Sequence, residues 1–220
     1  MKLYADPMAC SLASHVALVA SGLPHEIVWI DLKTWADPDG KRTADGRDFR
    51  AINPKGQVPV LELDDGSRLT EGSAILQYIG DRAPQSGLVP AAGTLERYRL
   101  QEWLNFIATE LHKAVFTPYF GADRQKLLPP EDLKKHVLGI LHQRFDYLEP
   151  RLQGRRYLMG EALTVADAYL LVILNWALFA KQDLGRWPAI AAYYKALNEH
   201  TAVRQVQHVE RDLRARLLAA

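Results

Sequence analysis

Hydrophobic and polar positions follow two different patterns along the chain, and the pattern changes near residue 90. Before that point, short runs of strand formers alternate with helical stripes of apolar residues. The predicted strands cover residues 2–5, 25–31, 58–63 and 67–70, and the predicted helices cover 11–21 and 72–82. The order is β-α-β, then a loop or short helix, then β-β-α, which is typical of a small α/β domain.

A break and a change to purely helical periodicity follow. The stretch APQSGLVPAAG (83–93) holds two prolines, two glycines and no charged residue, as linkers do. Beyond it the pattern predicts only helices, over 94–119, 130–152, 164–180, 187–199 and 201–216. We therefore expect an α/β domain over residues 1–82, a linker over 83–93, and an all-helical bundle domain over 94–220.

Composition narrows the class of protein. Lys and Arg total 27 against 26 Asp and Glu, so the near-neutral chain gives no reason to expect a nucleic acid or an anionic membrane as a partner. No run of 18 apolar residues is present, and the first ten residues lack an apolar signal-peptide core. A single cysteine cannot form an internal disulfide, so we expect a cytoplasmic protein with a reduced thiol.

That cysteine, Cys10, stands directly before a helical pattern in MACSLASHVALV. One interpretation is a small buried hydrophobe, the commoner role of a free cysteine. The other is a reactive thiol, because the N–H groups and positive dipole at a helix N-terminus favour the thiolate and lower the pKa. Ser11 next to it offers a hydroxyl donor.

Two further stretches of the first domain suggest ligand contacts. Pro59 inside an apolar run indicates either an edge strand or bulge, or a cis Val58–Pro59 bond that would turn the backbone of Val58 toward an extended peptide ligand. Glu71 and Gly72 lie where a strand meets a helix. They serve as a cap, or they hold the zwitterionic end of an amino acid, with the ammonium group on Glu71 and the carboxylate on helix N–H groups.

The first helix of the second domain carries Asn105, Thr109 and His112 at i, i+4 and i+7. The expected shared polar face is either solvated or turned toward a ligand. In the second case the histidine can donate a hydrogen bond to the ligand or stabilise a nearby thiolate. The other histidines have no metal-ligand spacing, so we expect no metal site. Further on, Thr164 and Asp167 have the spacing of a capping box in front of a helix that is apolar almost all round, which predicts a central, buried helix.

Taken in order, the Cys-Ser pair, INPKGQVPVL, LTEGSAI, ERY…EWLNFIATELHK and LTVADAYL resemble the glutathione S-transferases, and most of all their bacterial beta class. The resemblance covers essentially the whole chain. It implies a thioredoxin-like N-terminal domain with a mixed four-stranded sheet, a helical C-terminal domain, and a homodimer.

The resemblance also implies roles for individual residues. Cys10 faces the sulfur of glutathione and can form a mixed disulfide with it, and His112 is the second candidate catalytic residue. The implied glutathione-binding residues are Cys10, Lys41, Val58, Pro59, Glu71, Gly72, Asn105, Thr109 and His112. WADPDG (35–40) resembles an insertion before Lys41, so Lys33 and Arg42 remain alternatives for the cation that meets the glycyl carboxylate.

The expected function is the addition of the glutathione thiolate to a small apolar electrophile, with glutathione as cosubstrate. Residues near Met8, His112 and 115–121 are the expected pocket walls. Two alternatives stay open: a glutathione-dependent thiol-disulfide oxidoreductase with Cys10 as nucleophile, and a non-catalytic carrier of apolar ligands on the same fold.

Overall fold

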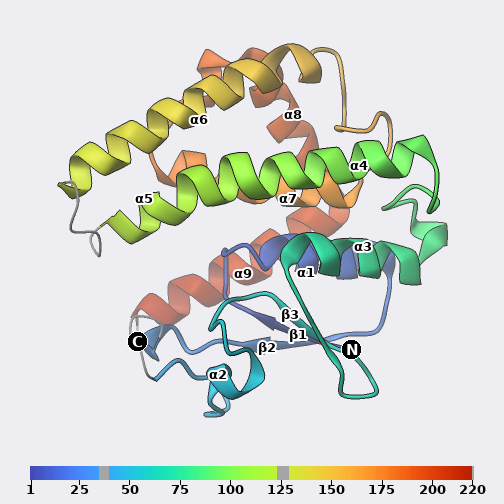
Figure 1. The fold of residues 1–220 in the computed structure, drawn as a ribbon, viewed down its shortest axis with the longest axis vertical. Helices are drawn as coiled ribbons and strands as arrows, with labels where there is room; N and C mark the ends of the chain where they lie inside the picture. Colours follow the sequence, from blue (N-terminus) through green and yellow to red (C-terminus); the bar gives the residue numbers. More distant parts are fainter. Residues whose placement is uncertain (35–39, 123–128, 220) are drawn as a thin grey trace. The chain divides into compact units, whose positions relative to one another are not determined.

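The computed structural model describes residues 1–34, 40–122 and 129–219 (Figure 1). Most of the stretch interpreted as an insertion, 35–40, therefore lies outside the described residues. The chain forms two compact units, one made of Met1–Val89 with His200–Ala220, and the other of Pro90–Glu199.

A four-stranded mixed sheet is the centre of the first unit, as predicted. Its strands are β1 (Lys2–Ala5), β2 (Glu26–Trp29), β3 (Val60–Glu62) and β4 (Arg68–Thr70), in the order β2-β1-β3-β4. β1 runs parallel to β2, whereas β3 is antiparallel to both β1 and β4. The hairpin between β3 and β4 turns at Gly66, whose φ of 82° suits a residue without a Cβ.

The register of these strands gathers three chain segments at one edge of the sheet. Val60 pairs with Tyr4 of β1 on one side and with Thr70 of β4 on the other. Because β3 runs opposite to its neighbours, the beginning of β3 lies beside the ends of β1 and β4. The residues that follow β1, precede β3 and follow β4 therefore share that edge.

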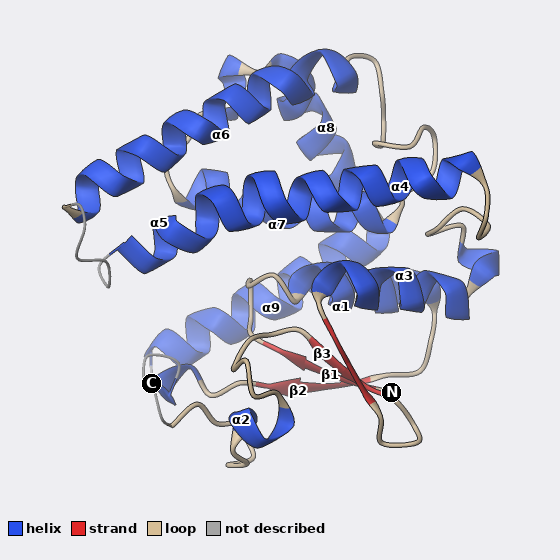
Figure 2. Ribbon diagram, viewed as in Figure 1, coloured by secondary structure: helices blue, strands red, loops and turns tan. Residues whose placement is uncertain are grey.

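Helices cover both faces of this sheet (Figure 2). The helical elements are α1 (Leu12–Ser21), η1 (Leu32–Thr34), α2 (Phe49–Ile52), α3 (Gly72–Arg82), η2 (Pro84–Ser86) and α9 (Thr201–Ala219). α1 and α3 pack together on one face, and α2 contributes Phe49 and Ile52 to a core with Tyr4 and Val60 on the other. Gly22 ends α1 in the left-handed conformation, as its position predicted.

The last helix, α9, belongs to the first unit, although the sequence pattern placed it with the helical domain. It packs on α1. Its buried Glu210 accepts hydrogen bonds from the Met8 N–H at 2.6 Å and pairs with His15 Nδ1 at 2.8 Å. Helical periodicity identifies an amphipathic helix, but it does not show which domain the helix covers.

The second unit is all helical, as predicted. Its elements are α4 (Leu95–Phe106), η3 (Ile107–Phe116), α5 (Thr117–Gly121), α6 (Pro130–Leu152), α7 (Val165–Phe179), η5 (Leu184–Arg186) and α8 (Pro188–Glu199). α7 is buried along almost its whole length, which confirms the interpretation of its apolar sequence. η3 is a π-helix that continues α4 without a break.

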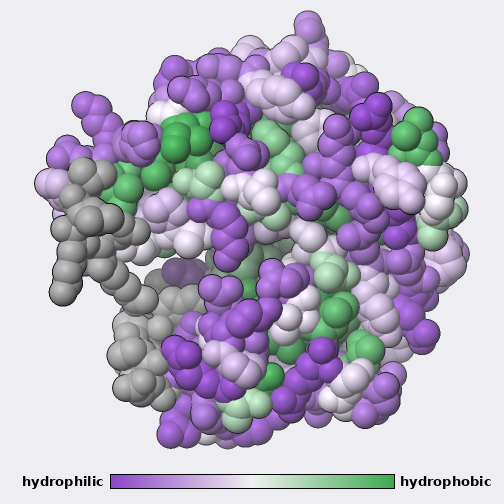
Figure 3. Space-filling view, viewed as in Figure 1, coloured by the Kyte–Doolittle hydropathy of each residue, from purple (hydrophilic) through white to green (hydrophobic). Residues whose placement is uncertain are grey.

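The face of the molecule in Figure 3 is mainly hydrophilic, with hydrophobic side chains in small separate groups, as is ordinary for a folded protein surface. No helix in the described ranges is both long and apolar enough to cross a bilayer.

The capping box in front of α7 is confirmed. Asp167 is fully buried, and its carboxylate accepts hydrogen bonds from Thr164 N–H at 2.8 Å, Leu158 N–H at 2.7 Å and Tyr193 Oη at 2.7 Å. The carboxylate of Asp167 therefore connects the start of α7 both to the preceding loop and to α8.

Replacing Asp167 by alanine should lower the free energy of unfolding by roughly 3–5 kcal/mol, because it leaves several buried donors without an acceptor. Asp183→Ala is the matched control, since that exposed aspartate caps η5 through a single hydrogen bond to Gly185 N–H at 2.8 Å. The control should lose only about 1 kcal/mol. Equal losses in urea unfolding at pH 7 would contradict this account.

Candidate functional site

Cys10 lies at the sheet edge defined above, between β1 and α1. Its side chain is half-buried against the core that contains Tyr4 and Val60. Cys10 Sγ lies 3.2 Å from the carbonyl oxygen of Val58, just before β3. The thiol therefore faces the segment that was predicted to present its backbone to a peptide ligand.

Ser11 does not serve as the donor that the sequence suggested. Its buried hydroxyl accepts from the Asp6 N–H and donates to the Asp6 carbonyl oxygen, both at 3.0 Å. The hydroxyl thus closes the loop that joins β1 to α1, and this fixes the position of Cys10 within the loop.

The Val58–Pro59 bond is cis, so the second of the two interpretations of this proline is confirmed. Asn53 stabilises the residue just before this bond, because its Nδ2 donates a hydrogen bond to the Gln57 carbonyl oxygen at 2.7 Å. Pairing of Val58 with a ligand stays a prediction.

Glu71 joins the same edge from the end of β4, where it is the N-cap residue of α3. Its φ of 70° is unusual for a residue with a side chain, and such strained positions concentrate at functional sites. Its carboxylate is exposed and pairs with Lys55 Nζ at 2.5 Å, and the same nitrogen lies 2.8 Å from Thr70 Oγ1. Among the described residues, apart from its chain neighbours and the nearby backbone of α3, no atom lies within 4 Å of the position that a Cβ on Gly72 would take.

Lys55 was missed by the sequence analysis. It stands in INPKGQVPVL, where the sequence analysis gave roles only to Val58 and Pro59, and its partner Glu71 is 16 residues away. The structure shows that charges of both signs meet beside the N-terminus of α3.

Among the three candidate cations, only Lys41 reaches the segment before Val58. Lys41 Nζ donates to the Gly56 carbonyl oxygen at 2.6 Å. Lys33 is exposed at η1, and Arg42 donates to the Gly46 carbonyl oxygen at 3.0 Å within its own turn. The geometry therefore favours Lys41 over both alternatives.

In the second unit, Asn105, Thr109 and His112 do not share one polar face. Asn105 and Thr109 are exposed, whereas His112 turns inward, with Nδ1 2.8 Å from Tyr169 Oη and its ring packed on Trp176. The expected face assumed α-helical spacing, but η3 has the wider turn of a π-helix, which rotates the later residues. Their place in a glutathione site stays a prediction.

Burial, with a smaller contribution from the positive charge of Lys113, lowers the pKa of His112 to about 4. The imidazole is therefore neutral at pH 7 and acts as a hydrogen-bonding group rather than as a cation. No group of three or more His, Cys, Asp or Glu side chains in the described part of the chain is arranged to hold a metal ion.

Asp6 is a second residue that the sequence analysis did not single out. It is buried in the loop that joins β1 to α1, and its Oδ1 has no hydrogen-bond partner among the residues that the structure describes. Burial raises the pKa of Asp6 to about 7; Arg214 opposes the shift, Glu210 adds to it, and Lys41 opposes it. A carboxyl group that titrates near neutrality thus lies next to the site.

Comparison with known proteins agrees with this architecture. Residues 7–82 match the family described as glutathione S-transferase, N-terminal domain, and residues 107–200 match the glutathione S-transferase C-terminal domain. The glutathione S-transferase GstA of Escherichia coli O157:H7 is 42% identical over 96% of this chain and 98% of its own length.

Solved structures give the same result. A sphingomonad glutathione S-transferase in complex with glutathione has a TM-score of 0.85 and 40% identity, and the match covers 96% of this chain and 98% of that one. The bacterial beta class enzyme of Sphingomonas chungbukensis has a TM-score of 0.85 and 36% identity, with the same coverage. The chain therefore belongs to the glutathione S-transferase family, and its enzyme class is that of a glutathione transferase.

The pKa of Asp6 predicts a pH-dependent stability. Between pH 3.8 and about 7 the folded protein keeps a proton on Asp6 that the unfolded chain releases, so the stability contributed by this group falls as the pH rises through that window. Asp6→Asn should remove this slope and gain roughly 2–4 kcal/mol relative to the wild type on going from pH 5 to pH 8. Urea unfolding at both pH values measures it, and parallel pH profiles for the two proteins would refute the assignment.

Proposed function

We propose that the protein transfers the glutathione thiolate to a small apolar electrophile, with glutathione bound along the sheet edge that carries Cys10, Val58 and Glu71. The observation that supports this most directly is the convergence of three chain segments, with Cys10 Sγ 3.2 Å from the Val58 carbonyl oxygen. The complex of glutathione with a sphingomonad relative supports the choice of ligand.

The chemistry of the edge matches the parts of the tripeptide. The γ-glutamyl end is a zwitterion, and its ammonium group suits the exposed Glu71 carboxylate, while its carboxylate suits the N–H groups of the first turn of α3. The cysteinyl unit pairs with the backbone of Val58 as an added strand. The glycyl carboxylate meets Lys41, whose Nζ already reaches Gly56.

In the reaction, the bound thiol loses its proton, a carbon–sulfur bond forms, and the displaced electron pair leaves with the leaving group or takes up a proton on the acceptor. The protein favours this step by holding the thiolate and by offering an apolar surface to the electrophile. In the second unit, the aromatic rings of Phe116, Phe120 and Trp176 pack together next to His112, and where the electrophile binds stays a prediction. The homodimer stays a prediction from the resemblance.

A thiol-disulfide exchange activity is the second candidate, because a cysteine stands where the glutathione sulfur is proposed to bind. In that step the Cys10 thiolate attacks oxidised glutathione, one protein–glutathione disulfide forms, and one reduced glutathione leaves.

Exposure to oxidised glutathione should add one glutathionyl group to the wild-type protein and none to Cys10→Ala, because Cys10 is the only thiol in the chain. Intact mass spectrometry measures the adduct, and treatment with a reductant should remove it. An unmodified wild-type protein would exclude the mixed disulfide. If Cys10→Ala still conjugates an electrophile, transfer does not need the disulfide.

Glu71→Gln should weaken glutathione binding about tenfold or more, because a charge-assisted hydrogen bond to the ligand ammonium group is worth roughly 1.5–3 kcal/mol. Glu26→Gln, which neutralises an exposed carboxylate on β2, is the control and should bind as the wild type does. Titration calorimetry at pH 7 compares the three proteins. An affinity of Glu71→Gln within twofold of the wild type would rule out this role.

A further inference from the structure

The segment between Lys41 and Val58 contains α2, and side chains from the sheet contact this segment before α2 and at the end of α2. Two of the proposed glutathione contacts, Lys41 and Val58, are the end points of this segment, and Lys55 lies within it. How α2 is fixed to the sheet therefore determines where these groups stand.

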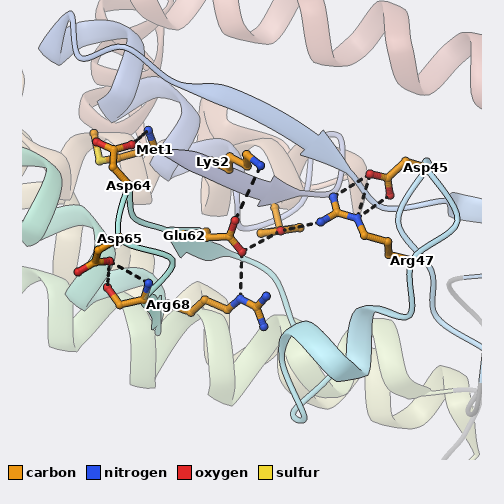
Figure 4. Close-up of polar contacts among 10 residues, drawn as sticks. Met1, Lys2, Asp45, Arg47, Glu62, Asp64, Asp65 and Arg68 are labelled. Atoms are coloured by element: carbon orange, nitrogen blue, oxygen red, sulfur yellow. Dashed lines mark hydrogen bonds and ion pairs between the residues drawn. The ribbon is translucent and has the colours of Figure 1, made fainter.

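Polar contacts from Lys2, Tyr4 and Arg68 meet at the carboxylate of Glu62, on the interior strand β3 (Figure 4). Its carboxylate accepts from Tyr4 Oη at 3.1 Å and from Arg68 Nε at 3.0 Å. Burial alone would raise the pKa of Glu62, but the hydrogen bonds from Arg68 and Tyr4, together with the positive charges of Arg68 and Lys2, outweigh it and hold the pKa below its usual value. The group is therefore a carboxylate fixed between two donors.

The first branch from Glu62 holds the chain just before α2. Tyr4 is buried, and its hydroxyl accepts from Arg47 Nη1 at 3.2 Å. Arg47 also makes a two-pronged ion pair with Asp45, with Nη2 2.7 Å from Oδ2. The chain at Lys41 is tied to the start of α2, because the Lys41 carbonyl oxygen accepts a hydrogen bond from the Phe49 N–H at 2.9 Å.

The second branch holds the other end of α2. Arg68 Nη1 donates to the carbonyl oxygens of Ala51 at 3.3 Å and Ile52 at 3.4 Å, the last two of the helix. Carbonyl groups at a helix C-terminus lack intrahelical donors, so a cation bound there stabilises the end. Asn53 follows at once and shapes the loop that contains Lys55 and Gln57.

We propose that Glu62, Tyr4, Arg47 and Arg68 form a clamp that positions the α2 segment for glutathione binding, and that Glu62 and its two donors act as positioning residues for the transferase. The inference rests on the proposed function, in which Lys41 and Val58 meet the ligand. The clamp residues touch α2 or one another, and none is proposed to touch glutathione.

The test compares two variants, each of which opens one branch. Tyr4→Phe removes the link to Arg47, and Arg68→Met removes the link to the end of α2. Each should raise the KM for glutathione about five- to tenfold and leave kcat at saturating glutathione within twofold, since the reacting groups are unchanged. Arg68→Lys should behave like Arg68→Met, because a lysine keeps the charge but lacks the fork that holds Glu62 and two carbonyl groups at once.

Lys2→Met is the matched control. Lys2 Nζ lies 3.9 Å from Glu62 on the opposite oxygen and belongs to β1, away from α2. Lys2→Met removes a positive charge next to Glu62 but leaves both branches in place, so the KM for glutathione should stay within twofold of the wild type. A rise equal to that of the branch variants would show that the loss of a positive charge next to Glu62, and not the loss of either branch, raises the KM, and the clamp would be rejected.

Hydrogen exchange separates the clamp from the proposed function. The amides of residues 41–58 should exchange faster in Tyr4→Phe and Arg68→Met than in Lys2→Met, under conditions where urea unfolding confirms that all three are folded. Unchanged exchange together with an unchanged KM would overturn the proposal. If the wild type fails to bind glutathione, the proposed function is wrong, and the exchange data still decide whether the clamp orders the segment.

Discussion

The antiparallel pairing of β3 with both of its neighbours is the constraint on which the first unit depends. Because Val60 pairs with Tyr4 and with Thr70, the chain segments that contain residues 10, 58 and 71 meet at one edge of the sheet. A shift of one residue in that register would turn the side chains of β3 to the opposite face and move Glu62 away from its partners. The same few backbone hydrogen bonds thus define the core, the candidate site and the polar contacts beneath it.

Much of the fold could be predicted from sequence because it follows local rules. The strands of the sheet, the ends of α1 and α3, and the capping box at Asp167 are each encoded within a few neighbouring residues. Cys10 and Glu71 were found for the same reason, since each stands at a junction between a strand and a helix. The comparisons then confirmed the family through matches over residues 7–82 and 107–200 rather than through any one residue.

What the sequence did not indicate depends on contacts between distant segments or on a change of helical geometry. Tyr4 and Glu62 are 58 residues apart and Lys55 and Glu71 are 16 apart, and no periodicity joins such pairs. The shared face of Asn105, Thr109 and His112 was expected from α-helical spacing, which η3 does not keep. Nothing in the neighbouring sequence indicates that Glu210 is buried against α1, because a glutamate in an amphipathic helix is ordinarily predicted to be exposed to solvent.

The placement of α9 has a consequence for how the protein is made. Domains often fold one after another as the chain leaves the ribosome, beginning at the N-terminus. Here the first unit includes His200–Ala220, so it lacks Glu210, the partner of His15, until the whole of the second unit has been translated. The second unit, Pro90–Glu199, is continuous and has all of its residues earlier. Of the two units, the one whose translation starts first is therefore the one whose last helix is made later.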